Sequence, residues 1–359
     1  MNILFLNSTR RGWGGNEKWT MLAAQTLARD YNTFLAYREP NIADRFTIEK
    51  FRLPFIAEID PVTIVRLIGI IRKRRIDVLV PTKRKDYVLA GIVSRICSTA
   101  NIVRLGIDRP LKDTFWNKLV YGTLADGIIV NSSKIRETLT KSSWIKPEKI
   151  RVIYNGLDCH KLETLSKEPF LKPAPFLIAS AGLLIARKGF EMLIHAFALF
   201  LKEVPDAQAA LVIAGDGPQH ATLQQLAETL NIQNNVHLTG FLDNPYPLYR
   251  NCDVFVSASS SEGISNALIE AMYLNCVPIS TPSGGIEEIM RDGENGFLVA
   301  HADKKKLAAL IDELYHNPNR RQCIGAAAHE TVLQAFSLDR MKKELLDFIV
   351  ETTRKKQCR

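Results

Sequence analysis

The sequence lacks the features that would place it in a membrane or in an oxidising compartment. No apolar run approaches the roughly 18 residues needed to span a bilayer. The chain opens as MNILFLN, a strand-like run without a preceding basic segment, so a signal peptide is not expected. The six cysteines are far apart and form no C-x-x-C pair, which argues against a disulfide framework or a cysteine metal site. These absences predict a cytoplasmic protein.

Basic residues gather in the first half of the chain. The 359 residues carry a net charge of +9. Residues 1–165 hold 28 lysines and arginines against 16 acidic residues, a net charge of +12, and the remainder carries −3. Any single cluster fits a solvated helix face, but a bias across a whole domain predicts an anionic partner: a membrane surface, a phosphorylated acceptor or a nucleic acid. Because the basic stretches lack interleaved aromatic residues and a recognisable nucleic-acid module, no nucleic-acid partner is expected.

Short apolar runs alternate with longer amphipathic segments. The runs are nearly continuous and rich in β-branched residues, as expected of strands covered by helices on both faces. The expected strands are NILFLN, TFLAY, DVLVP, NIVRLG, GIIVN and IRVIYN, then FLIASAG, AALVIAG, NVHLTG, CDVFVSAS and VPIST. Helices are expected over residues 15–29, 61–75, 85–97, 112–123 and 132–141. This alternation predicts an α/β protein with two Rossmann-like, doubly wound domains.

The expected domain boundary is the segment EPFLKPAP, which has three prolines and no hydrophobic period. We therefore expect a basic domain over residues 1–165 and a second domain over 170–335. Residues 336–359 form a charged amphipathic segment, predicted to be a helix that packs back on the first domain. If the carboxyl ends of the two sets of strands face each other, the domains enclose a cleft.

Glycines cluster just after the expected strands, where doubly wound sheets bind ligands. The clusters are RRGWGGNEKW in the first domain and AGLLIARKGF, AGDGP and SSSEGIS in the second. The last of these continues as SEGISNALIEAM, in which Glu262 and Glu270 lie on either side of a glycine turn and a helix start. Ser265 or Asn266 can cap this helix, and Gly263 lets the backbone turn.

A helix start of this kind suits a phosphate, because its free amides and its dipole both attract anions. Glu262 can reach a hydroxyl beside such a phosphate, and Glu270, one turn inside the helix, can accept hydrogen bonds from a ribose diol. The alternative is a capping device with a buried, paired Glu270. Arg187 and Lys188, in ARKGF, precede another helix. Because cations at a helix start oppose the helix dipole, their presence predicts that an anion binds between them. The alternative is that they are two solvated loop charges.

At this point the sequence resembles a known family. The segments GLLIARKGF, IAGDGPQ, NVHLTGF and DVFVSASSSEGISNALIEAM, followed by SGGIEEI and NGFLV, are similar to the donor domain of family 4 glycosyltransferases. Those enzymes are the retaining group with the GT-B fold. GGNEKW and VIYNGLD resemble landmarks elsewhere in the family, so the likeness covers nearly the whole chain.

The resemblance implies a nucleotide-sugar donor, with uracil the commonest base, and no metal ion. In this arrangement Glu270 binds the ribose, Glu262 contacts the sugar, and Lys188 with Arg187 neutralises the leaving diphosphate. The remaining donor-binding positions are main-chain amides of Gly263, Ile264 and Ser265 and the first-domain loop Gly14, Gly15 and Asn16.

The sequence departs from the family pattern near the reacting centre. An arginine common before the lysine motif is Leu183 here, and Arg187 is the candidate replacement. A histidine common after a first-domain strand is missing from NIVRLGIDRP, where Arg104 or Asp108 can take its place. With Lys188 and Glu262, Asp108 completes the set of candidate catalytic residues.

The basic domain is the expected acceptor domain. Lys83, Arg84 and Lys85 follow the strand DVLVP and, with Arg104, are the candidate acceptor-binding residues. The predicted function is transfer of a sugar to an anionic, lipid-linked glycan of the cell envelope, with peripheral contact at the inner face of an anionic membrane. The alternatives are a GT-B sugar-nucleotide epimerase and a non-catalytic sugar-nucleotide or nucleic-acid binding protein.

Overall fold

The computed structural model describes residues 1–10 and 13–358 and divides into two compact units. The first contains Met1–Gly156 together with the C-terminal segment from Leu338, and the second contains Leu157–Ser337. Arg11 and Gly12, in the first glycine cluster, lie outside the described residues. Helix α7 (Cys159–Leu165), which the sequence pattern assigned to the first domain, belongs to the second unit, where it contacts α10 (Tyr246–Asn251).

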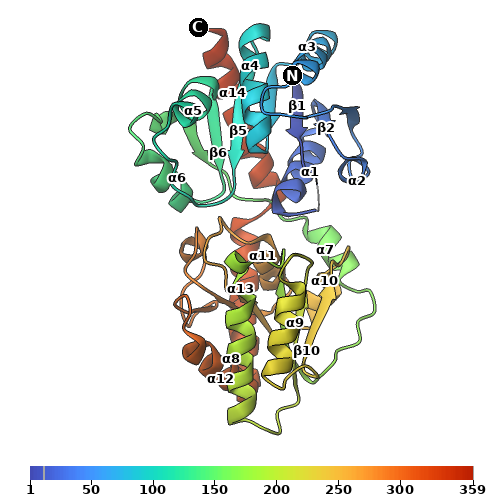
Figure 1. The fold of residues 1–359 in the computed structure, drawn as a ribbon, viewed down its shortest axis with the longest axis vertical. Helices are drawn as coiled ribbons and strands as arrows, with labels where there is room; N and C mark the ends of the chain where they lie inside the picture. The colour runs from blue at the N-terminus through green and yellow to red at the C-terminus, as the bar shows by residue number, and fades with distance from the viewer. Residues whose placement is uncertain (11–12, 359) are drawn as a thin grey trace. The chain divides into compact units, whose positions relative to one another are not determined.

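The first unit is built on a parallel sheet with the strand order β3-β2-β1-β4-β5-β6-β7 (Figure 1). Its strands are β1 (Asn2–Asn7), β2 (Asn32–Tyr37), β3 (Glu49–Arg52), β4 (Val78–Pro81), β5 (Ala100–Leu105), β6 (Gly127–Val130) and β7 (Ile150–Val152). The helical segments are α1 (Gly15–Leu27), α2 (Pro40–Ala43), α3 (Pro61–Arg74), α4 (Arg84–Cys97), α5 (Phe115–Asn117), η1 (Lys118–Leu124), α6 (Ser133–Thr140), η2 (Pro147–Lys149) and α14 (Leu338–Gln357).

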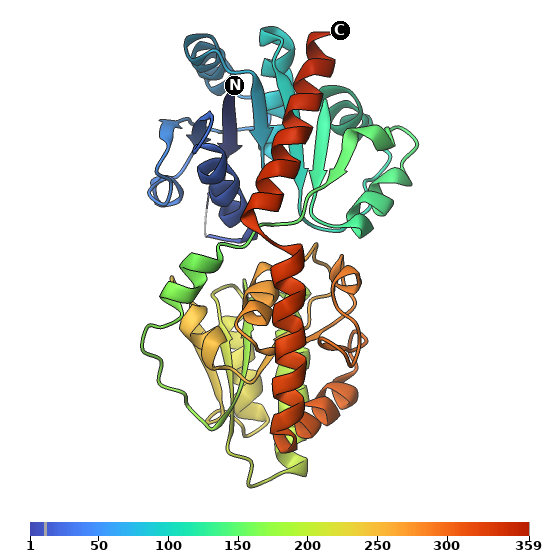
Figure 2. The ribbon, with the colours of Figure 1, turned by 180° about the vertical axis from the view of Figure 1, so that it is seen from behind.

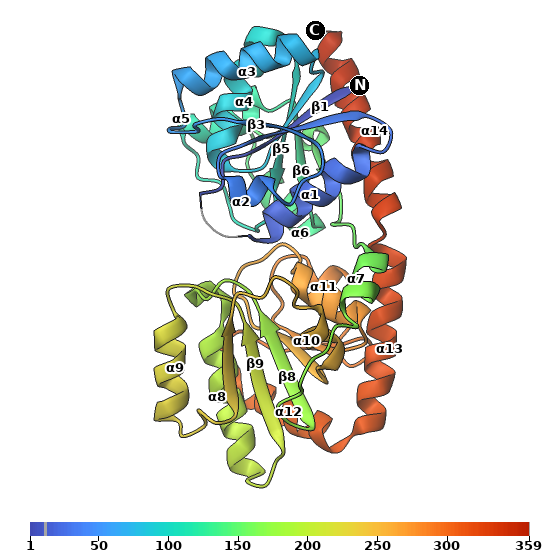
Figure 3. The same cartoon turned by 90° about the vertical axis from the view of Figure 1, so that its right-hand side faces the viewer.

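Helices cover both faces of this sheet (Figure 3). On one face Trp19 of α1 and Phe348 of α14 join the side chains of β1 and β4 in a single apolar cluster. On the other face Leu67 of α3 and Leu89 of α4 pack against the same sheet. The continuous apolar strands follow from this double burial.

Helix α14 returns to the first unit after the chain has built the second. Its apolar side chains face α1 and the sheet, and Figure 2 shows it running along the strands. Two ion pairs hold its outer part: Glu351 with Arg151 of β7 at 2.6 Å, and Lys356 with Asp126 at 3.2 Å.

The second unit contains a parallel sheet with the order β10-β9-β8-β11-β12-β13. Its strands are β8 (Phe176–Ala181), β9 (Ala209–Ala214), β10 (Val236–Gly240), β11 (Val254–Ser257), β12 (Val277–Ser280) and β13 (Phe297–Leu298). The other segments are η3 (Ala186–Lys188), α8 (Phe190–Glu203), α9 (His220–Thr229), α11 (Asn266–Tyr273), η4 (Ile286–Glu288), α12 (Lys304–His316) and α13 (Pro318–Ala335). Helices α8 and α9 lie on one side of the sheet and α11 and α13 on the other (Figure 3).

Two edge strands, β3 and β13, were not expected from the sequence. Strand β3 reads EKFR, so it lacks the apolar run that marks a buried strand, and charged residues are common on exposed sheet edges. Strand β13 has only two residues and pairs with the end of β12. The pattern of apolar residues in the sequence therefore predicts neither strand.

Candidate functional site

The loops after β8 and β11 carry the predicted donor site of the second unit. These strands are neighbours in the sheet, so their carboxyl ends place Arg187 and Lys188 beside Glu262. Gly189, at the start of α8, has a φ of +70°, and a Cβ there would lie 2.1 Å from the carbonyl oxygen of Ala258. Only glycine allows the two loops to approach this closely.

Glu262 binds both predicted cations through one carboxylate oxygen. Its Oε1 lies 3.1 Å from Nη1 of Arg187, forms an ion pair with Nζ of Lys188 and accepts a hydrogen bond from Ser259 at 3.2 Å. The Glu262 and Lys188 side chains are 14% and 15% exposed. The predicted catalytic pair is thus brought together as a half-buried ion pair.

Main-chain contacts fix this arrangement. Arg187 also donates to the carbonyl of Ser261 at 2.7 Å, and its own carbonyl accepts from the Ser260 amide at 2.8 Å. Gly284 has a φ of +62°, and a Cβ there would lie 2.1 Å from the carbonyl oxygen of Glu262. The Glu262 turn is therefore held between two neighbouring loops.

Helix α11 begins immediately after this turn. Ser265 occupies the cap position without a side-chain cap hydrogen bond, and Gly263 and Ile264 are buried beneath the turn. Glu270 lies one turn inside the helix and is almost fully buried. It neighbours Tyr249: burial raises the pKa of that phenol well above its ordinary value, and the Glu270 carboxylate raises it further. The two glutamates thus flank the first turn of α11, as expected.

In the first unit, the predicted loop Gly14-Gly15-Asn16 forms the start of α1. Gly14 is the cap residue, and its amide donates to Glu17 Oε2 at 3.1 Å. The Asn16 side chain donates to the carbonyl of Thr82 at 2.5 Å and accepts from Arg104. The side-chain amide of Asn16 is therefore already hydrogen-bonded within the unit. To contact a diphosphate as predicted, Asn16 would have to use its main-chain amide, or its side chain would have to leave Thr82 and Arg104.

Arg104 is a buried cation at the end of β5. Its side chain is 3% exposed, stacks 4.6 Å from the ring centre of Trp19 and donates to Asn155 Oδ1 at 3.1 Å as well as to Asn16. Burial lowers the pKa of the guanidinium to about 10. Among the described residues it has no ion-pair partner within 4 Å, and the charge of Glu17 compensates it only from a greater distance, so an anion at this edge would be attracted to it.

The other predicted acceptor residues follow β4, as expected, but two of them are engaged in the fold. Lys83 forms an ion pair with buried Glu17 at 2.6 Å. Lys85 donates to the carbonyls of Phe55 and Ile56, and burial lowers the pKa of its amine. Arg84 is exposed, with Glu58 at 3.8 Å.

Asp108 lies after β5 and is half-buried. It therefore lies just beyond the carboxyl end of this strand, and its assignment to the position of the family's histidine stays a prediction.

Sequence reasoning missed a buried acidic pair at this edge. The Glu17 carboxylate accepts a hydrogen bond from Thr9 at 2.6 Å. Burial by itself raises the pKa of Glu17, but the charge of Lys83 and the hydrogen bonds from Lys83 and Thr9 outweigh burial, so the pKa is lowered. Asp86, fully buried in the first turn of α4, accepts from the Ser8 amide at 3.1 Å. The available signal was their position: each stands in the first helical turn after a central strand.

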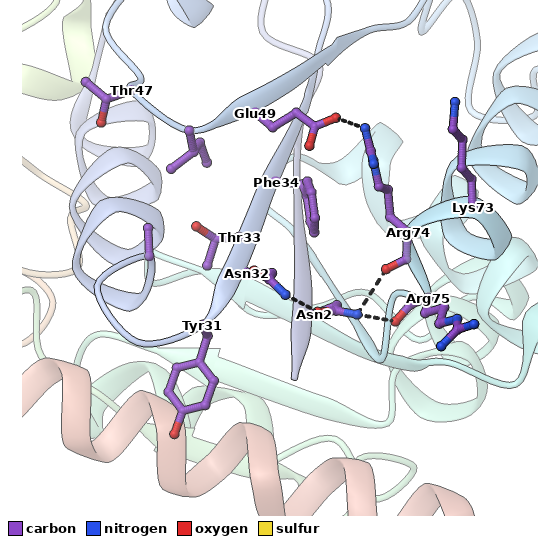
Figure 4. Close-up of a pocket in the computed structure, with 12 residues that line it drawn as sticks. Asn2, Tyr31, Asn32, Thr33, Phe34, Thr47, Glu49, Lys73, Arg74 and Arg75 are labelled. Atoms are coloured by element: carbon purple, nitrogen blue, oxygen red, sulfur yellow. Dashed lines mark hydrogen bonds and ion pairs between the residues drawn. The ribbon is translucent and has the colours of Figure 1, made fainter.

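A cavity of the first unit lies at the opposite edge of the sheet. It has a volume of about 600 Å³ and is lined at the amino ends of β1 and β2 by Asn2 and Asn32, next to the ion pair between Glu49 and Arg74 (Figure 4). Ligands of doubly wound sheets bind at the carboxyl ends of the strands. This cavity is therefore separate from the predicted site.

Two features are absent from the part of the chain that the structure describes: a metal-binding cluster and a membrane-spanning helix. No group of three or more histidine, cysteine or acidic side chains in residues 1–10 and 13–358 is arranged to hold a metal ion. Within the same residues, none of the helices combines the length and the apolar character that crossing a bilayer requires.

Known proteins resemble both halves of the chain. Residues 14–161 match the family model "Glycosyltransferase Family 4", and residues 163–331 match "Glycosyl transferases group 1". The lipopolysaccharide core biosynthesis glycosyltransferase LpsE of Rhizobium meliloti is 30% identical over 65% of this chain. An N-acetylgalactosaminyltransferase of Campylobacter jejuni that acts on a diphospho-undecaprenol acceptor is 28% identical over 72% of this chain and 69% of its own length. The chain spans 66% of the Rhizobium protein, just under two thirds.

Solved structures match over nearly the whole length. Anabaena HepE, crystallised with UDP, has a TM-score of 0.82 at 21% identity, covering 98% of this chain and all of that one. Sucrose-phosphate synthase of Thermosynechococcus elongatus has a TM-score of 0.76 at 18% identity, covering 98% of each. These matches confirm the expected pair of parallel-sheet α/β domains of GT-B type. With its two halves matched in this order by the two glycosyltransferase models, the chain belongs to family 4 of the glycosyltransferases.

Proposed function

We propose that the protein transfers a sugar from a nucleotide donor to an anionic glycan or glycolipid in the synthesis of a cell-envelope polysaccharide. The observation that carries this proposal is the cluster of Glu262, Arg187 and Lys188 at the start of α11. Two cations beside a helix N-terminus suit a diphosphate. Curated relatives that act in lipopolysaccharide and capsular polysaccharide synthesis support the class of product.

The reaction proposed for this site is displacement of the nucleoside diphosphate from the anomeric carbon of the sugar, with retention of configuration. The oxygen of the acceptor hydroxyl forms a bond to this carbon and loses its proton. The bond between the carbon and the diphosphate breaks, and its electron pair stays on the diphosphate oxygen. Lys188 and Arg187 stabilise that growing negative charge, the task that a metal ion performs elsewhere. Glu270 binds the ribose of the donor, and HepE, whose structures contain UDP and UDP-glucose, supports uracil as the base.

The first unit is the proposed acceptor domain. Arg84 is the most exposed of the three basic residues after β4, so binding an acceptor phosphate would cost it only a long, exposed ion pair with Glu58. Arg104 adds a buried positive charge at the same edge. Asp108 stands nearby, after β5, as the proposed catalytic residue of this unit.

The test is calorimetric titration of the purified protein with UDP, GDP and ADP in the absence of metal, beside the variant Glu270→Ala. We expect one nucleotide to bind and the variant to lose at least about tenfold in affinity, since a ribose diol loses a charged hydrogen-bond acceptor. If the folded wild-type protein binds none of them, the donor site is wrong. Release of the nucleoside diphosphate only when glycan is present would then separate a transferase from an epimerase.

We also propose peripheral contact between the first unit and an anionic membrane. Helix α3 buries Thr63, Leu67 and Ile71 but exposes a second apolar stripe, with Val62 at 49% and Val65 at 68% exposed. Positions three or four apart share a helix face, so exposed Arg66 joins these valines. An apolar stripe flanked by arginine is the composition of helices that lie in a bilayer interface.

Flotation with vesicles containing phosphatidylserine checks this membrane contact. The wild-type protein is expected to float, and the variant carrying Val62→Ser and Val65→Ser to bind about tenfold more weakly, because two apolar side chains no longer leave water. Leu171→Ser is the matched control, since Leu171 of the second unit is 93% exposed. A protein that stays at the bottom of the gradient with anionic vesicles would contradict the proposal.

A further inference from the structure

We propose that Glu262 is the resident counter-ion of Arg187 and Lys188, and that its charge shifts the selectivity of the site away from the nucleoside diphosphate product and toward the nucleotide-sugar donor. This inference rests on the proposed function and assigns Glu262 a role in discriminating between the two ligands, besides its contact with the sugar.

The first observation is that a single carboxylate oxygen of Glu262 makes all of these contacts. Oε1 forms ion pairs with Arg187 and Lys188 and accepts a hydrogen bond from Ser259. Oε2 accepts no hydrogen bond in the part of the chain that the structure describes. One carboxylate can therefore neutralise the cations through Oε1 and still offer Oε2 to a hydroxyl of the donor sugar.

The second observation is that this carboxylate is held where it is. Gly284 packs on the carbonyl of Glu262, the Thr281 hydroxyl donates to the carbonyl of Ser259 at 2.6 Å, and Ser260 is bonded to the carbonyl of Arg187. The negative charge of Glu262 thus stays beside the cations when a diphosphate enters.

The charge of Glu262 weakens the binding of the product more than that of the donor. Arg187, Lys188 and Glu262 together carry a net charge of +1. When the acceptor displaces the diphosphate and its hydroxyl proton is released, the diphosphate gains about one negative charge at neutral pH. The product is therefore repelled more strongly by Glu262 than the donor is. The donor also brings hydroxyls for Oε2, and the product does not, so the same carboxylate attracts one and disfavours the other.

The experiment compares two probes, UDP and UDP-glucose, by calorimetric titration of the wild type and Glu262→Gln. The glutamine keeps the shape and one acceptor oxygen but removes the charge. We expect the variant to bind UDP about tenfold more tightly and UDP-glucose with little gain, so that the ratio of the two dissociation constants shifts by about tenfold. Slower dissociation of UDP in stopped-flow displacement would accompany this.

Two further variants make the result specific. Glu203→Gln removes one negative charge from an exposed glutamate in the last turn of α8, at the other end of the helix that follows Lys188, and should leave the ratio at the wild-type value. Glu262→Asp keeps the charge and should bind UDP nearly as the wild type does. If Glu262→Gln binds UDP no more tightly than the wild type, the inference is overturned and the donor site stands. If the wild type binds neither probe nor GDP or ADP, the proposed function fails together with it.

Discussion

Replacement of Lys188 by alanine is expected to slow sugar transfer by about 10²–10³-fold, the usual cost of losing one group that stabilises transition-state charge. Lys188 is mostly buried, lies against the backbone of Gly182 and pairs with Glu262, so its ammonium group is prepositioned beside the proposed diphosphate. Arg187 remains in the variant, but its Nη1 is already bound to Ser261 and Glu262. It therefore cannot take over the position of the lysine.

The measurement is the rate of nucleoside diphosphate release from the nucleotide-sugar that the titrations identify, with and without acceptor. Because the lost interaction is made mainly in the transition state, kcat should fall far more than donor affinity does. Lys202→Ala is the control: it removes an exposed lysine in the last turn of α8, at the other end of the helix that follows Lys188. A kcat for Lys188→Ala within about threefold of the wild-type value would remove this lysine from the reaction.

The donor site could be predicted because it is built from local sequence. A strand, a glycine turn and a helix follow one another within residues 254–273, so the spacing between Glu262 and Glu270 already places them on either side of the helix start. The pairing of Glu262 with Lys188 joins residues 74 positions apart, yet it follows once β8 and β11 are neighbours in a doubly wound sheet.

The polar network of the first unit could not be predicted in the same way. Asn16 meets Arg104 across 88 residues, and Lys83 meets Glu17 because β1 and β4 are adjacent. From the sequence alone, the basic run after β4 has the composition of a free anion-binding surface. In the structure, Lys83 instead pairs with the buried carboxylate of Glu17, and Lys85 donates to backbone carbonyls. Buried polar groups need hydrogen-bond partners, and the topology of the sheet decides which residues can supply them.

Replacement of Asp86 by asparagine is expected to stabilise the first unit increasingly as the pH rises. Asp86 is fully buried; its Oδ2 accepts from the Ser8 amide, and among the described residues its Oδ1 has no hydrogen-bond partner. Burial raises the pKa of this carboxyl to about 6, against hydrogen bonds from Ser8 and the charge of Lys83. A carboxyl that is harder to ionise in the folded state makes that state bind more protons than the unfolded chain does between about pH 4 and 6.

The sign of the effect follows from this proton balance. Wild-type stability falls as the pH rises through that window, and above it the ionised carboxylate costs about 3 kcal/mol, the raised pKa converted to free energy. Asparagine has no such titration, so the free energy of unfolding of Asp86→Asn minus that of the wild type should increase by about this amount between pH 4 and pH 8. Any fixed cost of burying the amide changes the level of this difference but leaves its slope with pH unchanged.

Denaturation by urea, followed by tryptophan fluorescence, isolates the right part of the molecule, because Trp13, Trp19, Trp116 and Trp144 all belong to the first unit. Asp60→Asn is a control of opposite sign. Burial raises the pKa of Asp60, but hydrogen bonds from Thr63, Ile56 and Val62 outweigh it and lower the pKa, so this carboxylate stabilises the fold above the unfolded pKa.

The Asp60 variant should therefore lose stability relative to the wild type as the pH rises, while the Asp86 variant gains it. A flat difference for Asp86→Asn would mean that the carboxyl ionises without cost. A stability difference that increases with pH would show that the fold disfavours the ionised form of Asp86. An unfavourable buried charge at the carboxyl end of β4, where the acceptor is proposed to bind, is expected of a position kept for ligand binding rather than for stability.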